Sequence, residues 1–398
     1  MNDNQEKTIT LYPSNWLYNA GVVGFLRVLE FGNAGNMSEF IKDGDVKIDR
    51  QYIQESYKFI FKYHKQKMNE DFAIWGKNKR YPNYIQPAQK VFFEKHYIKS
   101  LQNVASNHSG KNCNWCEGYF LPNESLEKLK EEWISMKGQR QKGKAKSRQE
   151  EEGFNRFIEQ REKFQGIHIK ELGGAITEMP NAFWNLNFST PICHLCSYLI
   201  IFHHLAFFSL GKNYEIFINT PHFGLTWDLN KFVGDFLSKP IQYEIRKLLG
   251  SSLLQWAIKK KTLLGAWTMM NIEMIIKKWH REEKKWIIDY FDLPYYITRI
   301  LLDPEIASLI NTIGEEKIFD LIVSGKFSEL EKANYFVLRS LLKLKNNERI
   351  SESDPITKYA DNYRDKNHLI KVSNLLPELY AKITKILKTE VKYEWEIY

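Results

Sequence analysis

The chain has 398 residues, of which 43% are hydrophobic and 26% charged, and its formal net charge is +9. This composition excludes an intrinsically disordered protein, because it supplies enough apolar surface for a core. The length predicts two domains, or one domain with large insertions. A positive net charge favours a polyanionic partner such as nucleic acid, since neutralised phosphates release condensed counterions.

The first predicted element is a helix over residues 15–30, preceded by Pro13-Ser14 and followed by Gly32 as a stop signal. Glycine destabilises a helix interior by up to about 1 kcal/mol relative to alanine. This helix nevertheless contains a patch of small residues, so we expect another backbone to approach it closely there. The patch consists of Ala20, Gly21 and Gly24.

A second helix, rich in aromatic residues, is predicted over residues 51–68, and a loop follows it. The loop interleaves cations with aromatic and amide side chains. This mixture suits nucleic acid, because cations contact phosphates, rings stack on bases and amides hydrogen-bond base edges. A solvated loop whose rings pack on the core explains the pattern equally well. The candidate contacts are Lys77, Asn78, Lys79 and Arg80.

The four cysteines form two Cys-x-x-Cys pairs, Cys113/Cys116 and Cys193/Cys196. Each pair places two thiolates on one tight turn, and together the pairs supply the four ligands of one tetrahedral zinc ion. Four thiolates leave no position for water, so we expect structural zinc rather than a catalytic site. A redox or disulfide pair and an iron–sulfur cluster are the alternatives.

Residues 117–192 lie between the two pairs, and we call them the excursion. They contain a basic run, with no acidic residue from position 134 to 149. Runs of like charge are most often solvated. This run, however, belongs to an excursion whose two ends are held by the cysteine pairs. That favours a phosphate-binding arm, with candidate contacts at Lys137, Arg140, Lys142, Lys144, Lys146 and Arg148.

The most apolar stretch, residues 198–210, is about half the ~20 residues needed to cross a bilayer. We expect it to form a buried helix in which His203 and His204 are hydrogen-bonded core residues. Residues 1–7 lack the basic start and apolar core of a signal peptide. A cytoplasmic protein without a membrane partner is therefore expected, and in that compartment cysteine pairs bind metal more often than they form disulfides.

The rest of the chain predicts one strand and several helices. The strand covers residues 214–220, with residues 167–178 as a possible partner. Periodic apolar patterns predict helices over 241–261, 263–289, 296–311, 333–345 and 367–387. The predicted fold is α+β. A nucleic-acid-recognition domain covers residues 1–240, with a zinc-clamped insertion at about 105–200, and a helical bundle covers 241–398.

Known catalytic motifs do not match this sequence. A zinc deaminase needs His-x-Glu before Pro-Cys-x-x-Cys, but Ile192 separates Pro191 from Cys193, and Lys170 stands where His168 would need a glutamate. Phosphate-loop, dinucleotide-binding and nucleophile-elbow motifs do not occur either. A protein without catalytic residues is therefore expected, and a zinc-containing, metal-dependent enzyme acting on nucleic acid is the alternative.

The two cysteine pairs and the segment Trp16-Leu17-Tyr18-Asn19-Ala20-Gly21-Val22-Val23-Gly24-Phe25 together resemble the CXXC–CXXC large subunit of type I-B CRISPR Cascade complexes. The resemblance covers that segment and residues 113–196. It implies a non-catalytic subunit of an RNA-guided DNA surveillance complex. Such a subunit contributes to recognition of the motif beside the DNA target, to strand separation and to recruitment of a helicase-nuclease. The implied partners are crRNA, target double-stranded DNA, other Cascade subunits and the helicase-nuclease.

Overall fold

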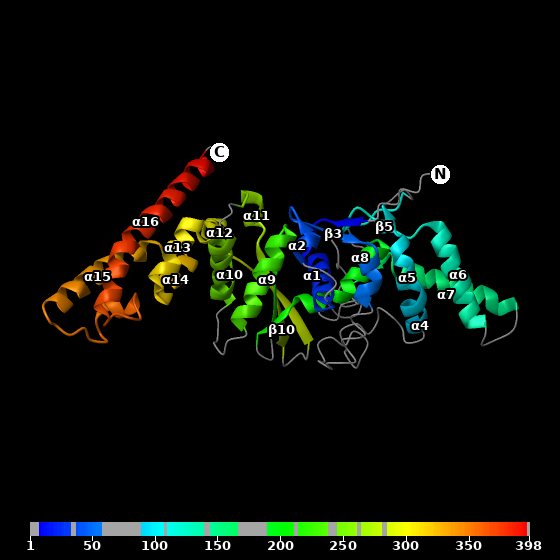
Figure 1. The fold of residues 1–398 in the computed structure, drawn as a ribbon, viewed down its shortest axis with the longest axis horizontal. Helices are drawn as coiled ribbons and strands as arrows, with labels where there is room; N and C mark the ends of the chain where they lie inside the picture. Colours follow the sequence, from blue (N-terminus) through cyan, green and yellow to red (C-terminus); the bar gives the residue numbers. More distant parts are fainter. Residues whose placement is uncertain are drawn as a thin grey trace. The chain divides into compact units, whose positions relative to one another are not determined.

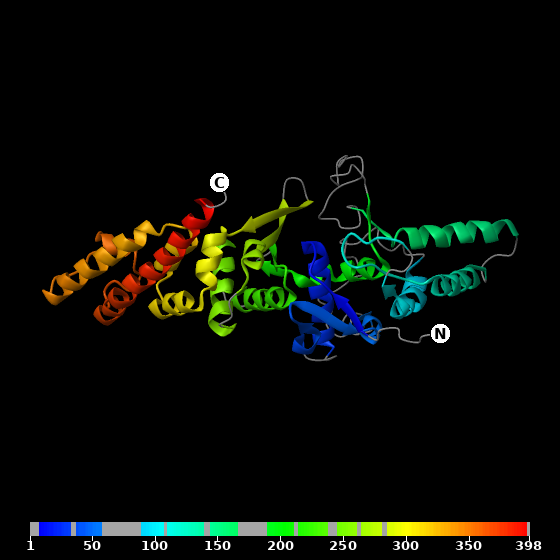
Figure 2. The ribbon, with the colours of Figure 1, turned by 90° about the horizontal axis from the view of Figure 1, so that it is seen from above.

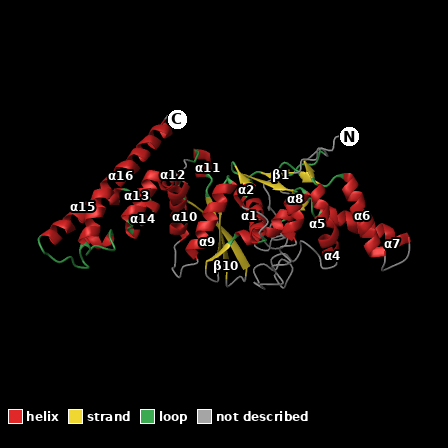
Figure 3. Ribbon diagram, viewed as in Figure 1, coloured by secondary structure: helices red, strands yellow, loops and turns green. Residues whose placement is uncertain are grey.

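The computed structural model describes residues 8–32, 37–57, 89–106, 110–138, 144–165, 189–210, 214–237, 245–260, 264–280 and 285–395. The chain is an α+β protein with more helix than strand (Figure 3). It divides into two compact units, residues 1–227 with 275–290 and residues 228–274 with 291–398. The division therefore falls before the predicted boundary at residue 240, and residues 275–290 return to the first unit.

The first unit begins with a small antiparallel sheet in the order β1-β3-β2. Thr8 pairs with Asp49 and Leu11 with Val46, so alternate side chains of β1 and β3 face the core. The strands are β1 (Thr8–Leu11), β2 (Ile41–Lys42) and β3 (Asp45–Asp49), and a short helix, α2 (Met37–Phe40), precedes β2.

Helix α1 (Trp16–Phe31) has the predicted position, with Asn15 as its N-cap and Gly32 at its end. Asn15 Oδ1 accepts hydrogen bonds from the backbone N–H groups of Leu17 and Tyr18 at 3.1 and 3.0 Å. The predicted close approach is confirmed, because Gly21 and Gly24 lie against the backbone of residues 199–202. A β-carbon on Gly21 would lie 2.8 Å from the carbonyl oxygen of Leu199.

The apolar stretch packed against α1 is buried, as predicted, but it is not one continuous α-helix. It forms α8 (His194–Leu199), the 3₁₀ helix η8 (Ile200–Ala206) and strand β8 (Phe208–Leu210). His203 is fully buried, and its Nδ1 lies 2.9 Å from the carbonyl oxygen of Ile200. The prediction of a hydrogen-bonded core histidine is confirmed for His203.

The predicted strand at residues 214–220 is confirmed as β9 (Tyr214–Asn219), in a four-stranded sheet ordered β11-β10-β9-β8. Its neighbours are β8 and β10, whereas the proposed partner at residues 167–178 lies outside the described residues. The predicted helix over 263–289 is wrong. Among the described residues of this range only α11 (Ala266–Met270) is helical, and β10 (Glu273–His280) and β11 (Lys285–Asp292) follow it. Isoleucine pairs at 275–276 and 287–288 favour strands, and pairing with β9 satisfies the backbone.

The segment around the excursion consists of short elements and two longer helices, all in the first unit. They are α4 (Lys90–Phe92), the π-helix η3 (Phe93–Tyr97), α5 (Ile98–Ser100), η4 (Leu101–Asn103), β4 (Ala105–Ser106), β5 (Tyr119–Phe120), α6 (Asn123–Gly138), α7 (Lys144–Glu159), β6 (Lys163–Phe164) and β7 (Thr190–Pro191). Helices α6 and α7 pack together, with Trp133 Nε1 donating to the Glu150 carbonyl oxygen at 3.1 Å.

The second unit is helical, and its helices α15 and α16 run side by side (Figures 1 and 2). The predicted helix over 296–311 is divided at Asp303-Pro304, where Asp303 Oδ1 caps the second part by accepting from Glu305 N and Ile306 N. The elements are α10 (Ile245–Lys260), α11, α12 (Tyr295–Leu302), α13 (Pro304–Ile313), α14 (Glu316–Val323), α15 (Ser328–Lys345), η9 (Pro355–Lys358) and α16 (Lys366–Trp395); α9 (Phe223–Leu237) crosses the division. Within the described ranges, none of the helices combines the length and apolar character needed to cross a membrane.

Candidate metal centre

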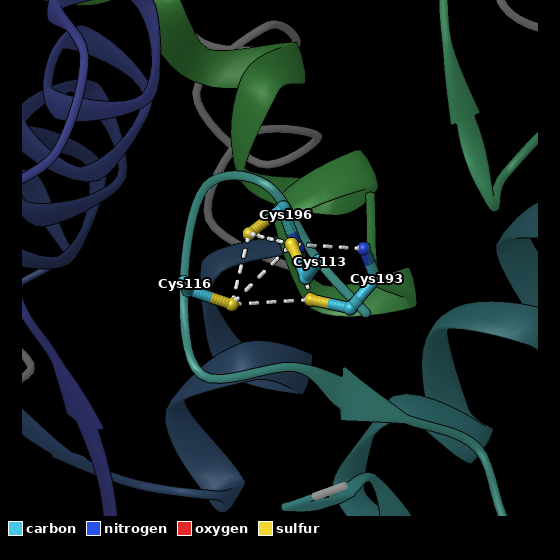
Figure 4. Close-up of side chains that lie close together, drawn as sticks. All are labelled: Cys113, Cys116, Cys193 and Cys196. Carbon is cyan, nitrogen blue, oxygen red and sulfur yellow. Dashed lines mark hydrogen bonds between the residues drawn. The ribbon is translucent and has the colours of Figure 1, made fainter. Parts of the chain in front are cut away.

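Two short antiparallel ladders bring the cysteine pairs together. The first pair lies in the loop between β4 and β5, where Ala105 pairs with Phe120. The second pair follows β7, whose Pro191 pairs with Lys163 of β6. The Asn114 N–H donates to the Pro191 carbonyl oxygen at 3.0 Å, which joins the two turns directly. All four sulfur atoms consequently lie within 4.8 Å of one another (Figure 4).

The sulfur separations fit a single tetrahedral ion. Cys116 Sγ lies 3.4 Å from Cys193 Sγ and 3.3 Å from Cys196 Sγ, and Cys113 Sγ lies 3.7 Å from both Cys116 Sγ and Cys196 Sγ. Four sulfurs at about 2.3 Å from a central ion are separated by about 3.8 Å, whereas a disulfide bond is only about 2.05 Å long. The thiols are free. A cluster of several metal atoms would hold the sulfurs further apart.

Backbone N–H groups surround the sulfur atoms as they do in metal-binding turns. Trp115 N and Cys193 N both donate to Cys113 Sγ, at 3.5 and 3.2 Å. Gly118 N donates to Cys116 Sγ at 3.3 Å, from a backbone with φ of +91° that favours glycine. Cys193 is the N-cap of α8, and its sulfur accepts from Cys196 N at 3.4 Å. These hydrogen bonds stabilise thiolates and fix the orientation of metal ligands.

Cys113 differs from Cys193 and Cys196 in proton affinity. Cys193 and Cys196 are fully buried, and burial raises the pKa of both thiols well above the ordinary value. Hydrogen bonds from the thiols of Cys116, Cys193 and Cys196 lower the pKa of half-buried Cys113. Without a cation the buried pair holds its protons, so a divalent ion must displace them as it binds.

His194 lies between Cys193 and Cys196 and is not one of the four clustered side chains that could hold an ion. It is fully buried, and its Nδ1 accepts from the Leu121 N–H at 3.1 Å. The proton is therefore on Nε2, which lies 3.5 Å from Glu162 Oε1. Burial lowers the pKa of His194 to about 3, so the ring is neutral. Sequence reasoning missed this residue, although its position inside Cys-His-Leu-Cys was a usable signal.

Glu162 joins the end of the excursion's second helix to the cluster. Its carboxylate accepts from Lys111 Nζ at 2.6 Å, and its carbonyl oxygen accepts from Ile192 N at 3.0 Å. The preceding residue, Arg161, is fully buried against aromatic rings, with its guanidinium 3.5 Å from the centre of the Phe157 ring. The other two rings beside it belong to Phe93 and Tyr97 of η3. The start and end of the excursion are therefore both held.

Helix α1 also reaches the cluster, through Tyr18. This tyrosine is buried, and its hydroxyl has no hydrogen-bond partner among the residues that the structure describes. Burial, followed by the charges of Cys196, Cys116, Cys193 and Cys113, raises its pKa well above the ordinary value. The segment around Tyr18 and the cysteine pairs, distant in sequence, thus lie together in the fold.

The structure brings together the predicted metal ligands but gives no geometry for the predicted nucleic-acid contacts. Lys77, Asn78, Lys79, Arg80, Arg140 and Lys142 lie outside the described residues. Lys137 lies near the end of α6, and Lys144, Lys146 and Arg148 lie in the first turns of α7, with side chains outside the description. The described residues of the basic run therefore belong to the end of α6 and the start of α7.

The chain matches no protein-family model, no curated protein and no solved structure. We therefore derive the chemistry of the cluster from its four cysteines alone. Four thiolates in a tetrahedral arrangement bind a single soft or borderline metal ion and leave no coordination position for water or substrate.

Proposed function

We propose that this chain is the non-catalytic large subunit of a cytoplasmic CRISPR RNA-guided DNA surveillance complex of type I-B, with structural zinc in its four-cysteine cluster. The observation that carries the proposal is the closed four-thiolate cluster at the base of the excursion. The same cysteine pairs carry the sequence resemblance to the family.

The fold supports this proposal through the relation between α1 and the cluster. The resemblance rests on two parts of the sequence, residues 16–25 and 113–196. In the folded chain Gly21 and Gly24 pack on the backbone that follows Cys196, and Tyr18 is buried beside the thiols. Because these two parts of the chain pack against each other, a change in one affects the other. This supports treating them as parts of one family signature.

Zinc is the ion that suits the cluster best. It accepts four sulfur ligands in a tetrahedron without a geometric preference of its own, and it is redox-inert. Binding energies of about 10–16 kcal/mol are typical of structural zinc. The entropic cost of closing the excursion grows only with the logarithm of its length. Zinc binding is therefore strong enough to hold both ends of a long insertion.

In this proposal the excursion contributes the nucleic-acid contacts. The junction of α6 and α7 carries the basic run, and its cations would bind phosphates of crRNA or target double-stranded DNA. The subunit would help to recognise the target-adjacent motif, to separate the strands and to recruit the helicase-nuclease. Base pairing with the guide would supply most of the sequence specificity.

The test is to purify the tagged chain from cells that co-express a type I-B CRISPR array and the other Cascade subunits. We expect one zinc ion per chain by mass spectrometry of metals, together with the other subunits and a uniform short RNA with a repeat-derived end. Absence of both RNA and subunits would refute the proposal. Reproducible cleavage or deamination of labelled DNA or RNA by the isolated chain, with Mg²⁺ or Mn²⁺, would favour the enzymatic alternative.

A further inference from the structure

A polar cleft in the first unit is formed by the segment of η3, α5 and η4 on one side and α6 on the other. Its volume is about 520 Å³. Three lysines line it, two from the first segment and one from α6, together with short hydroxyl and amide side chains. These lining residues are Lys95, Lys99, Lys128, Ser100, Asn103 and Ser125.

The cleft has an excess of positive charge. Its three lysines are exposed, and within the described part of the chain no ion pair involves any of them. Glu132 is the acidic residue in the lining, and its Oε2 lies 2.7 Å from His96 Nδ1, so a neighbouring side chain already engages it. Other glutamates of α6, such as Glu127 and Glu131, lie on the adjacent face of the helix. The cleft therefore attracts an anion.

The side chains in the cleft suit phosphate oxygens rather than bases. Ammonium, hydroxyl and amide groups donate hydrogen bonds to phosphate oxygens. The one ring in the lining, His96, already stacks on Phe92 with centroids 5.5 Å apart. Stacking of bases on aromatic rings is thus not provided, and contacts of this kind do not read sequence.

The spacing of the cations suits several phosphates in a row. Lys95 and Lys99 are four residues apart along a helical segment, where side chains are separated by about 6 Å. This is similar to the spacing of successive phosphates along a strand. Lys128 lies across the cleft from them, on α6. The three cations therefore border one space and can contact neighbouring phosphates of one strand.

We propose that this cleft binds the backbone phosphates of a single nucleic-acid strand without reading its bases. The proposal rests on the proposed function, because it takes nucleic acid as the partner, and it adds a second binding site separate from the basic run. RNA and DNA share the phosphodiester chemistry that the cleft recognises, so the experiment must distinguish them from each other and from free phosphates.

The test compares two triple variants of the purified full chain in fluorescence-anisotropy titrations. The first is Lys95→Gln, Lys99→Gln and Lys128→Gln. The matched control is Lys42→Gln, Lys47→Gln and Lys371→Gln, which removes the same charge from exposed lysines elsewhere. The probes are single-stranded RNA and single-stranded DNA of two unrelated sequences, duplex DNA, and inorganic tripolyphosphate as a competitor. Circular dichroism and zinc content establish that both variants are folded.

We expect the first variant to lose affinity for single strands by about tenfold or more, and the control by less than about threefold. The slope of log affinity against log salt should become shallower by about 2 in the first variant, since each phosphate contact on a single strand contributes about 0.7. The two sequences should bind equally. A higher affinity of the wild-type chain for the RNA or for the DNA probe then shows which kind of strand the cleft binds.

Three outcomes would each refute strand binding by the cleft. They are equal affinities for the two variants, no binding of any single strand by the wild-type chain, and binding of tripolyphosphate alone. These outcomes are separable from failure of the proposed function. If the first variant binds normally while crRNA still co-purifies with the wild-type chain, only the cleft is refuted. If oligonucleotides bind through the cleft but no guide RNA or subunit co-purifies, only the proposed function is refuted.

Discussion

Gly24 of α1 lies against the carbonyl oxygen of Phe202, so closely that a β-carbon at position 24 would overlap that oxygen. The contact fixes α1 on the segment that continues from the metal-binding turn of Cys193 and Cys196. It explains why a helix with good capping tolerates glycine in its interior, where alanine would otherwise be favoured.

Gly24→Ala should destabilise the first unit. Alanine normally stabilises a helix interior by up to about 1 kcal/mol over glycine, but here the β-carbon must displace backbone, and overpacking costs about 1–3 kcal/mol or more. We expect a net loss of about 2 kcal/mol in the free energy of unfolding, measured by urea titration. Gly153→Ala in α7 is the matched control, because its β-carbon would meet Trp133 at an ordinary 3.7 Å. That variant should be slightly more stable, and equal effects would contradict the explanation.

Cys193→Ser should abolish metal binding, because its sulfur is buried and a serine hydroxyl does not replace a thiolate ligand. We expect metal content to fall from one ion per chain to near zero. Limited proteolysis should then cut the excursion, while the second unit stays protected. Cys116→His tests the chemistry, since a Cys₃His set also binds zinc and this position is half-exposed. That variant should retain metal, and loss of metal in both variants alike would argue against coordination as the cause.

His194 should make stability depend on pH. Burial lowers its folded-state pKa to about 3, whereas an unfolded histidine has a pKa of about 6.5. Between these values the unfolded chain binds more protons, so stability falls as pH decreases, by about 1.4 kcal/mol per pH unit for this group. Above pH 6.5 this contribution is constant. Urea titrations from pH 7 to pH 5 should show a shallower loss for His194→Gln than for the wild type, and parallel curves would exclude His194 as the source.

Arg161→Ala should destabilise the chain by about 3 kcal/mol, because it removes a large buried side chain from between three aromatic rings and leaves a cavity. It also removes the hydrogen bond from Nη1 to the Phe157 carbonyl oxygen. Arg156→Ala, five residues earlier in α7 and mostly exposed, should change the free energy of unfolding by less than about 0.5 kcal/mol. A small effect at both positions would mean that Arg161 does not anchor α7.

The sequence was most informative where short-range chemistry defines the structure. Asn15 and Gly32 delimit α1 through local backbone hydrogen bonds, so its boundaries were predictable. The placing of both thiols of each cysteine pair on one turn was predictable for the same reason, since two intervening residues suffice for it. The charged residues of 134–149 were visible as well, but their charge pattern did not predict that α6 ends and α7 begins within that run.

The wrong prediction at residues 263–289 arises because long-range strand pairing, rather than short-range chemistry, determines the structure there. Its apolar residues fit both a helical and an extended pattern, and β9 decides between them by supplying a neighbouring strand. The cleft escaped prediction because Lys95 and Lys128 come from separate helical segments, and only their packing places them on one surface.

The sequence by itself determined that four cysteines could supply the ligands of one ion, where α1 begins and ends, and that glycines 21 and 24 meet another backbone. Only the tertiary structure decided which backbone that is, and that His194, Glu162 and Arg161 hold the excursion against the cluster. The physical reason is range. Caps and metal-binding turns form between residues a few positions apart, whereas burial, ion pairs and clefts depend on distant segments that meet only when the core is packed.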